Sequence, residues 1–211
     1  MRSNITKSRL GILLSKLDQF KSLKVRLEQY TTDPEIAADI LWKALYLGDI
    51  KGKVIGDMGC GVGILGLGAL ILGAQKVILI DIDDEAISIA KSNYHIVKSE
   101  TSIAGKAAFK TMDIKDFKDK LDCVIENPPF GIKNVHADRA FLLKAIKIAP
   151  VIYSFHKSES LSFLKSFCKD NNMQITHVWN FNFPLKATYT FHQKRIQRIK
   201  VSCYRLERKI I

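Results

Sequence analysis

Short apolar segments alternate with amphipathic, helix-like segments along most of this chain, and no other feature of the sequence restricts its fold as strongly. Apolar runs that predict strands cover 54–55, 77–80, 107–111, 123–125, 151–155, 174–181 and 196–206. Helical spacing predicts helices over 64–73, 85–98, 139–149 and 161–169. Strands that alternate with helices predict an α/β fold, with a parallel sheet and helices on both of its faces. The last two segments form a β-rich end, and we expect them to pair antiparallel.

Polar residues stand where the first four of these strands end. In a sheet of this kind, ligands bind at the carboxyl ends of the strands. Those ends carry Asp57, Asp81, Asp113 and Asn127. We therefore expect the chemistry of this protein to take place at this edge of the sheet.

The length and composition fit one globular domain. With 211 residues, 47% of them hydrophobic and 26% charged, the chain can bury a proper core, which excludes a disordered tail protein and a disulfide scaffold. No apolar run reaches the ~18 residues that cross a bilayer, and we recognise no secretory signal. The cysteines form no Cys-x-x-Cys pair, so we expect reduced thiols in the cytoplasm and no zinc site. They are Cys60, Cys123, Cys168 and Cys203.

The net charge of +12 comes from the two ends of the chain. Residues 1–27, where we expect a helical extension, hold seven basic residues and one acid, and the β-rich segment 183–211 holds eight and one. The region between them is close to neutral. This distribution predicts a globular body with a face that binds a polyanion. A basic surface that serves only solubility, or a mitochondrial transit peptide at the start, would show the same excess.

A glycine-rich loop, DMGCGVG at residues 57–63, joins the first strand of the alternating region to a helix. Residues 61–66 read GVGILG, which fits the dinucleotide-binding pattern G-x-G-x-x-G. Asp81 follows Gly61 by 20 residues, where an acid that binds a ribose is expected. From these residues alone, a nicotinamide-binding domain is one interpretation and a simple glycine-rich turn is another.

The charge of Asp57 favours a different cofactor. A carboxylate at the mouth of the loop repels a pyrophosphate and attracts a ligand that presents positive charge. S-adenosylmethionine carries an ammonium and a sulfonium group and no phosphate. The glycines allow the backbone to approach its methionine part closely, Asp57 suits its amine, and Asp81 suits its ribose hydroxyls. Asp113 would accept a hydrogen bond from the adenine amino group, unless it is a solvated loop acid.

The sequence Asn-Pro-Pro-Phe follows the fourth predicted strand, at residues 127–130. Two consecutive prolines stiffen the turn and hold the Asn127 side chain and the Pro128 carbonyl as fixed acceptors, beside the ring of Phe130. An adenine amino group is a poor nucleophile because its lone pair is delocalised into the ring. Two acceptors for its hydrogens would direct that lone pair at the methyl group of the sulfonium, while Phe130 stacks on the base. A rigid turn without a catalytic role is the simpler interpretation.

Together these motifs resemble those of the small-subunit ribosomal RNA adenine-N6 methyltransferases, the methyltransferase-like-five family of archaea and eukaryotes. The resemblance covers nearly the whole chain. It is carried by LEQYTT at 27–32, DMGCGVG at 57–63, DID at 81–83, NPPFG at 127–131 with KN at 133–134, SFHKS at 154–158 and FH at 191–192. It implies one class I, Rossmann-like methyltransferase domain over 1–211, with a seven-stranded, mostly parallel sheet. The implied reaction is methyl transfer from S-adenosylmethionine to N6 of an adenosine in small-subunit ribosomal RNA.

The resemblance also implies which residues form the site. The segment 29–32 would fold back over the cofactor, and Val62 departs from a cysteine that eukaryotic members often carry. The implied cofactor pocket contains Gln29, Tyr30, Thr32, Asp57, Gly59, Gly61, Val62, Gly63, Ile64, Asp81, Ile82, Asp113, Ile114 and Asn127. The implied catalytic residues are Asn127, Pro128, Pro129 and Phe130.

The basic ends of the chain then acquire a role. An adenosine in folded RNA must leave its stack to reach the pocket, at a cost of a few kcal/mol, and lysines and arginines on the phosphates would offset that cost. The candidates for RNA contact are Lys133, His156, Lys157, His192, Lys194 and Arg195. Eukaryotic members work with a small zinc-binding activator protein that extends their sheet. The predicted strand 107–111 would be the edge on which such a partner docks, or an edge that is merely capped.

Other functions share parts of this pattern. A protein methyltransferase that acts on a glutamine amide would use the same Asn-Pro-Pro-aromatic sequence, because an amide nitrogen is an equally poor nucleophile. The basic ends favour RNA instead. DNA adenine is a further possible acceptor, but no separate sequence-reading domain is evident. A non-catalytic RNA-binding or ribosome assembly factor would have no need for Asp81 and Asn127.

Overall fold

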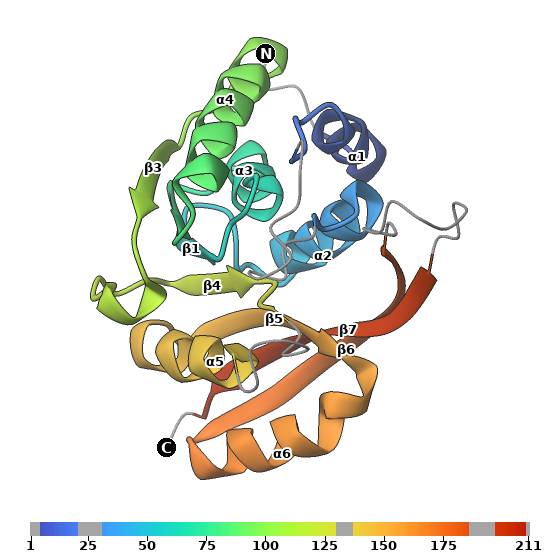
Figure 1. The fold of residues 1–211 in the computed structure, drawn as a ribbon, viewed down its shortest axis with the longest axis vertical. Coiled ribbons are helices and arrows are strands. Elements are labelled where there is room, and N and C mark those ends of the chain that lie inside the picture. Colours follow the sequence, from blue (N-terminus) through green and yellow to red (C-terminus); the bar gives the residue numbers. More distant parts are fainter. Residues whose placement is uncertain (1–4, 21–30, 130–136, 186–196, 210–211) are drawn as a thin grey trace.

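The computed structural model describes residues 5–20, 31–129, 137–185 and 197–209. The predicted strands and helices appear in the predicted order, and a further helix over 34–46 was not predicted (Figure 1). The helices are α1 (Lys7–Ser15), α2 (Pro34–Tyr46), α3 (Ile64–Ile71), α4 (Asp84–Glu100), α5 (Ala137–Ile148) and α6 (Leu161–Asp170). The strands are β1 (Val54–Met58), β2 (Lys76–Asp81), β3 (Lys106–Thr111), β4 (Cys123–Glu126), β5 (Val151–Lys157), β6 (Met173–Leu185) and β7 (Gln197–Arg208). Two 3₁₀ turns are η2 (Ile114–Asp116) and η3 (Ser158–Ser160).

The strands form one seven-stranded sheet in the order β3-β2-β1-β4-β5-β7-β6. Strands β1 to β5 are parallel, and β7 pairs antiparallel with both β5 and β6. The predicted mostly parallel sheet with two antiparallel closing strands is therefore confirmed. The sequence order reverses between β1 and β4, and in such sheets a ligand crevice opens at that point.

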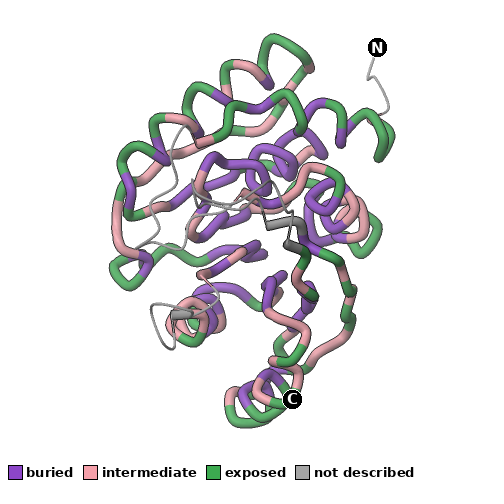
Figure 2. The backbone as a smooth tube through the Cα atoms, turned by 45° about the vertical axis from the view of Figure 1, so that its right-hand side comes forward, coloured by how far each residue is buried: buried purple, intermediate pink, exposed green. Residues whose placement is uncertain are grey.

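Helices cover both faces of the sheet. Side chains of α1, α2, α3 and α4 pack on one face in a single apolar cluster, and those of α5 and α6 pack on the other face. Figure 2 shows the buried backbone gathered between these layers. Helix α3 lies especially close to its neighbours, because a Cβ added at Gly68 would come within 2.3 Å of the Leu41 side chain. Gly68 is therefore required for the close packing of α3 against α2.

Helix α2 begins where the sequence places a proline. The Asp33 carboxylate caps the helix by accepting hydrogen bonds from the backbone N–H groups of Glu35 (2.9 Å) and Ile36 (3.2 Å). Pro34 occupies the first helical position, where no backbone donor is needed. Helix α1, the described part of the predicted N-terminal extension, packs on α2 and α3.

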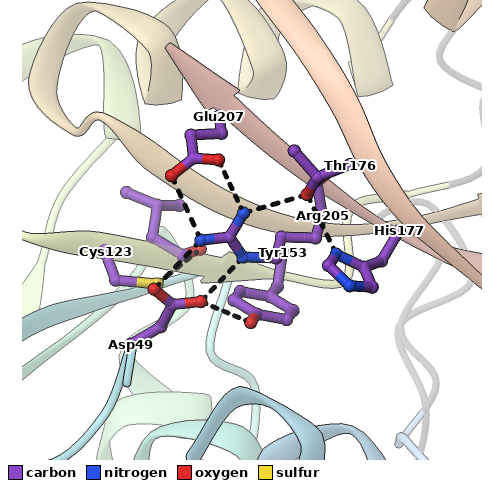
Figure 3. Close-up of polar contacts among 8 residues, drawn as sticks. Asp49, Cys123, Tyr153, Thr176, His177, Arg205 and Glu207 are labelled. Atoms are coloured by element: carbon purple, nitrogen blue, oxygen red, sulfur yellow. Dashed lines mark hydrogen bonds and ion pairs between the residues drawn. The ribbon is translucent and has the colours of Figure 1, made fainter. Parts of the chain in front are cut away.

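A buried ionic network ties β7 to the first half of the chain (Figure 3). Arg205 of β7 donates hydrogen bonds to both carboxylate oxygens of Asp49 (2.8 and 3.2 Å) and to Glu207 (3.0 Å). The Tyr153 hydroxyl donates to the same Asp49 carboxylate at 2.6 Å. Burial alone would lower the pKa of Arg205, but its hydrogen bonds to Asp49 and Glu207 raise it, so the guanidinium stays charged. The network joins the turn after α2 to the last three strands of the sheet.

The four cysteines are buried free thiols. In the part of the chain that the structure describes, no helix is both long enough and apolar enough to span a bilayer.

Candidate active site

A pocket opens at the carboxyl ends of β1 and β4, where the sequence predicted the site. Its walls come from three segments: the residues before α2, the glycine loop with the start of α3, and the residue after β4. The lining residues are Thr31, Thr32, Asp57, Gly59, Cys60, Gly61, Val62, Ile64, Leu65 and Asn127. The structure thus brings together residues about 95 positions apart that the sequence placed in one cofactor and acceptor site.

The glycine loop owes its shape to three left-handed residues. Gly59, Gly61 and Gly63 have φ angles of +66°, +52° and +85°. Side chains rarely adopt this conformation, and a Cβ on Gly63 would also come within 2.9 Å of the Leu79 side chain. Gly63 precedes α3 without a side-chain cap. The loop therefore presents backbone groups to the pocket, as a cradle for a ligand requires.

Asp57 lies beneath this loop and is almost fully buried. Its carboxylate accepts a hydrogen bond from the backbone N–H of Gly66 in α3 at 2.7 Å. Burial raises the pKa of Asp57 to about 7, and the nearby charge of Asp81 also raises it. The Asp57 carboxyl group therefore changes between its neutral and charged forms near neutral pH, and a cation bound beside it would favour the charged form.

Asp81, at the end of β2, holds the loop in place. It accepts hydrogen bonds from the backbone N–H groups of Gly61 (2.8 Å) and Asp83 (3.0 Å). Burial raises the pKa of Asp81. The next residue, Ile82, leaves 60% of its surface exposed. An exposed isoleucine beside a half-buried acid suits an adenosine, whose ribose and flat base need an acceptor and an apolar contact.

Asp113 and Ile114 lie at the end of β3, as predicted. Asp113 caps η2 by accepting a hydrogen bond from the backbone N–H of Lys115 at 2.9 Å, and Ile114 is buried. Together with Asp81 and Ile82, these residues stand at the carboxyl edge but outside the pocket lining given above. They mark the side of the site toward β2 and β3.

The Asn-Pro-Pro corner forms the opposite wall. The Asn127 side-chain amide donates a hydrogen bond to the hydroxyl of Thr32 at 2.9 Å. Pro128, which follows, is buried, and Pro129 is half-buried. A donor group fixed on Thr32 fixes the carbonyl oxygen of the same planar amide. The segment before α2 therefore orients the predicted catalytic side chain, a contact that the sequence did not suggest.

Asn93 of α4 connects the glycine loop to the N-terminal segment. Its side chain is fully buried. Its amide donates to the carbonyl oxygens of Val62 (2.9 Å) and Asp18 (3.0 Å) and accepts from the Asp18 N–H (2.7 Å). The ring of Phe20 lies against Gly61. Sequence analysis missed Asn93, although a polar residue between Ala90 and Val97 on the apolar face of a helix was a usable signal.

A buried polar chain lies next to the corner, and sequence analysis missed this chain too. The Ser154 hydroxyl donates to one oxygen of Glu126 (2.8 Å) and contacts His156 Nε2 (2.8 Å). His156 Nδ1 lies 3.6 Å from a carboxylate oxygen of Asp138. The other oxygen of Glu126 has no hydrogen-bond partner among the described residues. Burial raises the pKa of Glu126 to about 8, so the folded protein holds this group protonated at neutral pH.

The prediction that His156 contacts RNA is wrong. Only 1% of this residue is exposed. Its ring packs edge-on against Tyr204 and contacts Ser154, because β5 turns this side chain toward α5. Lys157, the next residue, is half-buried at the end of β5. The remaining predicted site residues lie outside the described parts of the chain: Gln29, Tyr30, Phe130, Lys133, His192, Lys194 and Arg195.

Glu126 should make the stability of the protein depend on pH. Its pKa is raised above 4.5, its value in the unfolded chain. The contribution of Glu126 to the stability of the folded protein is therefore fully present below about pH 4.5 and is lost as pH rises through about 8. We expect Glu126→Gln to remove this loss, making the variant more stable than the natural protein at pH 9 by an amount on the order of a few kcal/mol. Urea unfolding at pH 5 and pH 9 measures the difference, and an equal difference at both values would contradict the assignment.

Comparison of the sequence with known proteins identifies the family to which the chain belongs. The chain is 38% identical to an uncharacterised protein of Methanocaldococcus jannaschii, over 97% of this chain and 95% of that protein. It is 32% identical to the rRNA N6-adenosine methyltransferase METTL5 of Danio rerio, over 91% of this chain and 94% of that enzyme. The chain belongs to the rRNA N6-adenosine methyltransferase family.

Two further likenesses place the chain among methyltransferases. The crystal structure of a candidate RNA methyltransferase from Pyrococcus horikoshii is 41% identical, covers 98% of this chain and 99% of its own, and superposes with a TM-score of 0.88. The family model of the ribosomal protein L11 methyltransferases matches residues 42–128, from α2 to the Asn-Pro-Pro corner. This member of the rRNA N6-adenosine methyltransferase family therefore has the predicted class I, Rossmann-like fold and uses S-adenosylmethionine. A nicotinamide-binding domain is excluded.

Proposed function

We propose that this enzyme transfers a methyl group from S-adenosylmethionine to N6 of an adenosine in small-subunit ribosomal RNA. The observation that carries the proposal is the Asn127 side chain, fixed on Thr32 and lining the same pocket as the glycine loop. A primary amine on a flat base is the acceptor that such a corner suits. The METTL5 relative of Danio rerio is named for the same reaction on ribosomal RNA.

The described residues fit the cofactor. The backbone of the loop at Gly59 and Gly61 would hold its methionine part, and Asp57 its ammonium group. Asp81 and Asp113 would accept hydrogen bonds from the ribose hydroxyls and the adenine amino group. When bound, the cofactor supplies an electrophilic methyl group on a sulfonium. No described residue in this set carries a positive charge that would repel it.

The chain itself contributes positioning and fixed dipoles. The Asn127 side-chain oxygen and the Pro128 carbonyl would accept the two hydrogens of the adenine amino group. Those hydrogen bonds move the nitrogen away from its planar form and direct its lone pair into the pocket. Asn93 and Thr32 tie the N-terminal segment to the loop and to the corner, so the two halves of the site keep one geometry. Phe130 would stack on the base.

We also propose a cytoplasmic enzyme that accepts a partner at β3. Strand β3 is an edge of the sheet, and no described strand pairs with its outer side. Such an edge supports the docking of a small zinc-binding activator by strand addition.

The substrate is tested by supplying one methyl donor and several acceptors. Labelled S-adenosylmethionine is incubated with the enzyme and, separately, small-subunit RNA, large-subunit RNA, a glutamine-containing ribosomal protein, and duplex DNA. We expect label in small-subunit RNA and its recovery as N6-methyladenosine after digestion. Label in the protein, with none in RNA, would overturn the proposal in favour of a glutamine methyltransferase. Equal label in both RNAs would overturn the small-subunit assignment alone.

Cofactor affinity should depend on the charge of Asp57. Because the pKa of this group is about 7 in the empty pocket, binding an ammonium beside it at lower pH requires loss of a proton. We expect the Kd for S-adenosylmethionine to fall severalfold as pH rises from 6 to 8, approaching tenfold per unit on the acidic side. Calorimetry measures this slope. The isosteric Asp57→Asn should bind more weakly and lose the slope, and a slope retained by that variant would contradict the role of Asp57.

A further inference from the structure

Strands β6 and β7 extend beyond the rest of the sheet on the side of the site. The pairing of β5 with β7 stops at Lys157 and Val201, whereas β6 and β7 continue to pair through 182–185 and 197–200. At ~3.3 Å per residue, this extension, which we call the β6–β7 arm, reaches roughly 13 Å past β5. Because β7 is antiparallel to β5, the arm stands at the carboxyl edge. Figure 1 shows β7 curving away from the sheet there.

The two faces of the arm differ in burial. One face is anchored in the protein core at the base of the arm, and the other, which we call the open face, is exposed. The anchored face carries Phe183 and Val201, both fully buried in the core cluster under α2. The Lys43 ammonium of α2 also lies 5.6 Å from the centroid of the Phe181 ring on this side. The opposite face is set by the period of two along a strand. It carries exposed Asn182 and, from β7, exposed Arg198 and Lys200. The open face is therefore polar, and the packing of the anchored face in the core holds it in place.

The open face carries positive charges and no acidic side chain from its own two strands. From Asn171 to Leu206 the sequence contains no aspartate or glutamate and six lysines and arginines. Of these, Arg205 is already paired with Asp49 and Glu207. Arg198 and Lys200 form no ion pair with any residue that the structure describes. Asn182 lies opposite Lys200 in the register and adds amide donors. Such a set of donors and positive charges suits phosphate groups.

We propose that the open face of the β6–β7 arm binds the phosphate backbone of the RNA strand that flanks the target adenosine. This inference rests on the proposed function. Only β5 separates β7 from β4, which leads into Asn127. Across the sheet, the arm and the acceptor corner are therefore about two strand spacings, ~10 Å, apart, and the arm also projects beyond the corner along the strand direction. A strand whose adenosine enters the pocket passes the arm within a few nucleotides. Phosphate contacts of this kind fix the position of the strand without reading its sequence and help to offset the cost of extruding the base.

The test removes charge from the open face and compares it with equal removal elsewhere. The variant is Arg198→Gln with Lys200→Gln, and the matched control is Lys51→Gln with Lys76→Gln, both exposed near the amino ends of β1 and β2, away from the site. We expect the arm variant to raise the KM for small-subunit RNA tenfold or more. The slope of log affinity against log salt should fall by roughly 0.7 to 0.9 per lost phosphate contact. The Kd for S-adenosylmethionine and the melting temperature should stay unchanged, and the control should stay within twofold of the natural protein.

Two outcomes would overturn the inference. One is an arm variant with the RNA KM and salt slope of the natural protein, as expected if the open face binds an acidic protein instead. The other is an equal loss in the control pair, which would assign the effect to net charge. Asn182→Asp, which adds a negative charge and keeps the side-chain shape, gives an independent second test and should weaken RNA binding in the same way. If the natural enzyme methylates no RNA at all, the proposed function fails, and that result is distinct from methylation that tolerates the arm variants.

Discussion

Replacing Asn127 with alanine should abolish methyl transfer and leave the cofactor bound. The Asn127 amide is held by Thr32 at one end, and its oxygen is the acceptor assigned to the adenine amino group. Loss of one preorganised hydrogen-bonding group in an active site typically costs about 100- to 1,000-fold in turnover. Single-turnover methylation of RNA measures the rate, and calorimetry measures the Kd for S-adenosylmethionine, which should change by no more than a few-fold.

A second variant separates the chemistry of Asn127 from its positioning. Thr32→Val keeps the shape of the hydroxyl residue and removes the hydrogen bond that orients the amide. We expect it to lower turnover by roughly tenfold, less than Asn127→Ala, because the acceptor oxygen is retained but no longer fixed. If Asn127→Ala instead lost the cofactor together with turnover, Asn127 would be a cofactor ligand and its assigned catalytic role would be contradicted.

Of the substitutions proposed for this protein, Arg205→Met should cause the largest loss in the free energy of unfolding. Among the described residues, the change leaves the buried Asp49 carboxylate with only the Tyr153 hydroxyl as a side-chain hydrogen-bond partner (Figure 3). Breaking a buried pair by removing one member typically costs about 3–5 kcal/mol, because a buried charge is left without compensation. Urea unfolding at pH 7 measures the free energy of unfolding. The melting temperature should fall in parallel.

The double variant Asp49→Asn with Arg205→Met is the control for this loss. It removes both charges, so we expect it to regain much of the stability that the single variant loses. Lys110→Ala provides a second comparison, because the Lys110–Asp119 pair is exposed and such pairs are worth at most about 1 kcal/mol. If Arg205→Met were no more harmful than Lys110→Ala, the network would not be what secures β7 to the body.

The sequence predicted those parts of the fold that short-range patterns encode. Each predicted strand and helix of the alternating region is present, because a run such as 77–80 is apolar throughout and is buried on both faces. The observed bounds of the strands and helices differ from the predicted ones by only a few residues. The chemistry at the strand ends was also predictable, since parallel strands end at one edge. Asp57 and Asn127 therefore line one pocket although 70 positions separate them.

The missed residues all depend on contacts between distant segments. Asn93 meets Asp18 across 75 positions, and Arg205 meets Asp49 across 156. No local pattern specifies such pairs. His156 was misassigned to RNA contact for the same reason: no local pattern shows that the pleat of β5 turns its side chain toward Ser154 and Tyr204.

The most direct measurement is a crystal structure of the enzyme with S-adenosylmethionine bound. The central claim is that the donor methyl group and the acceptor amine meet at the Asn-Pro-Pro corner. We predict the sulfonium methyl group beside Asn127, with the ammonium at Asp57 and the ribose at Asp81. A cofactor seated away from Asn127, or a corner closed off from the bound cofactor by packed side chains, would contradict the account.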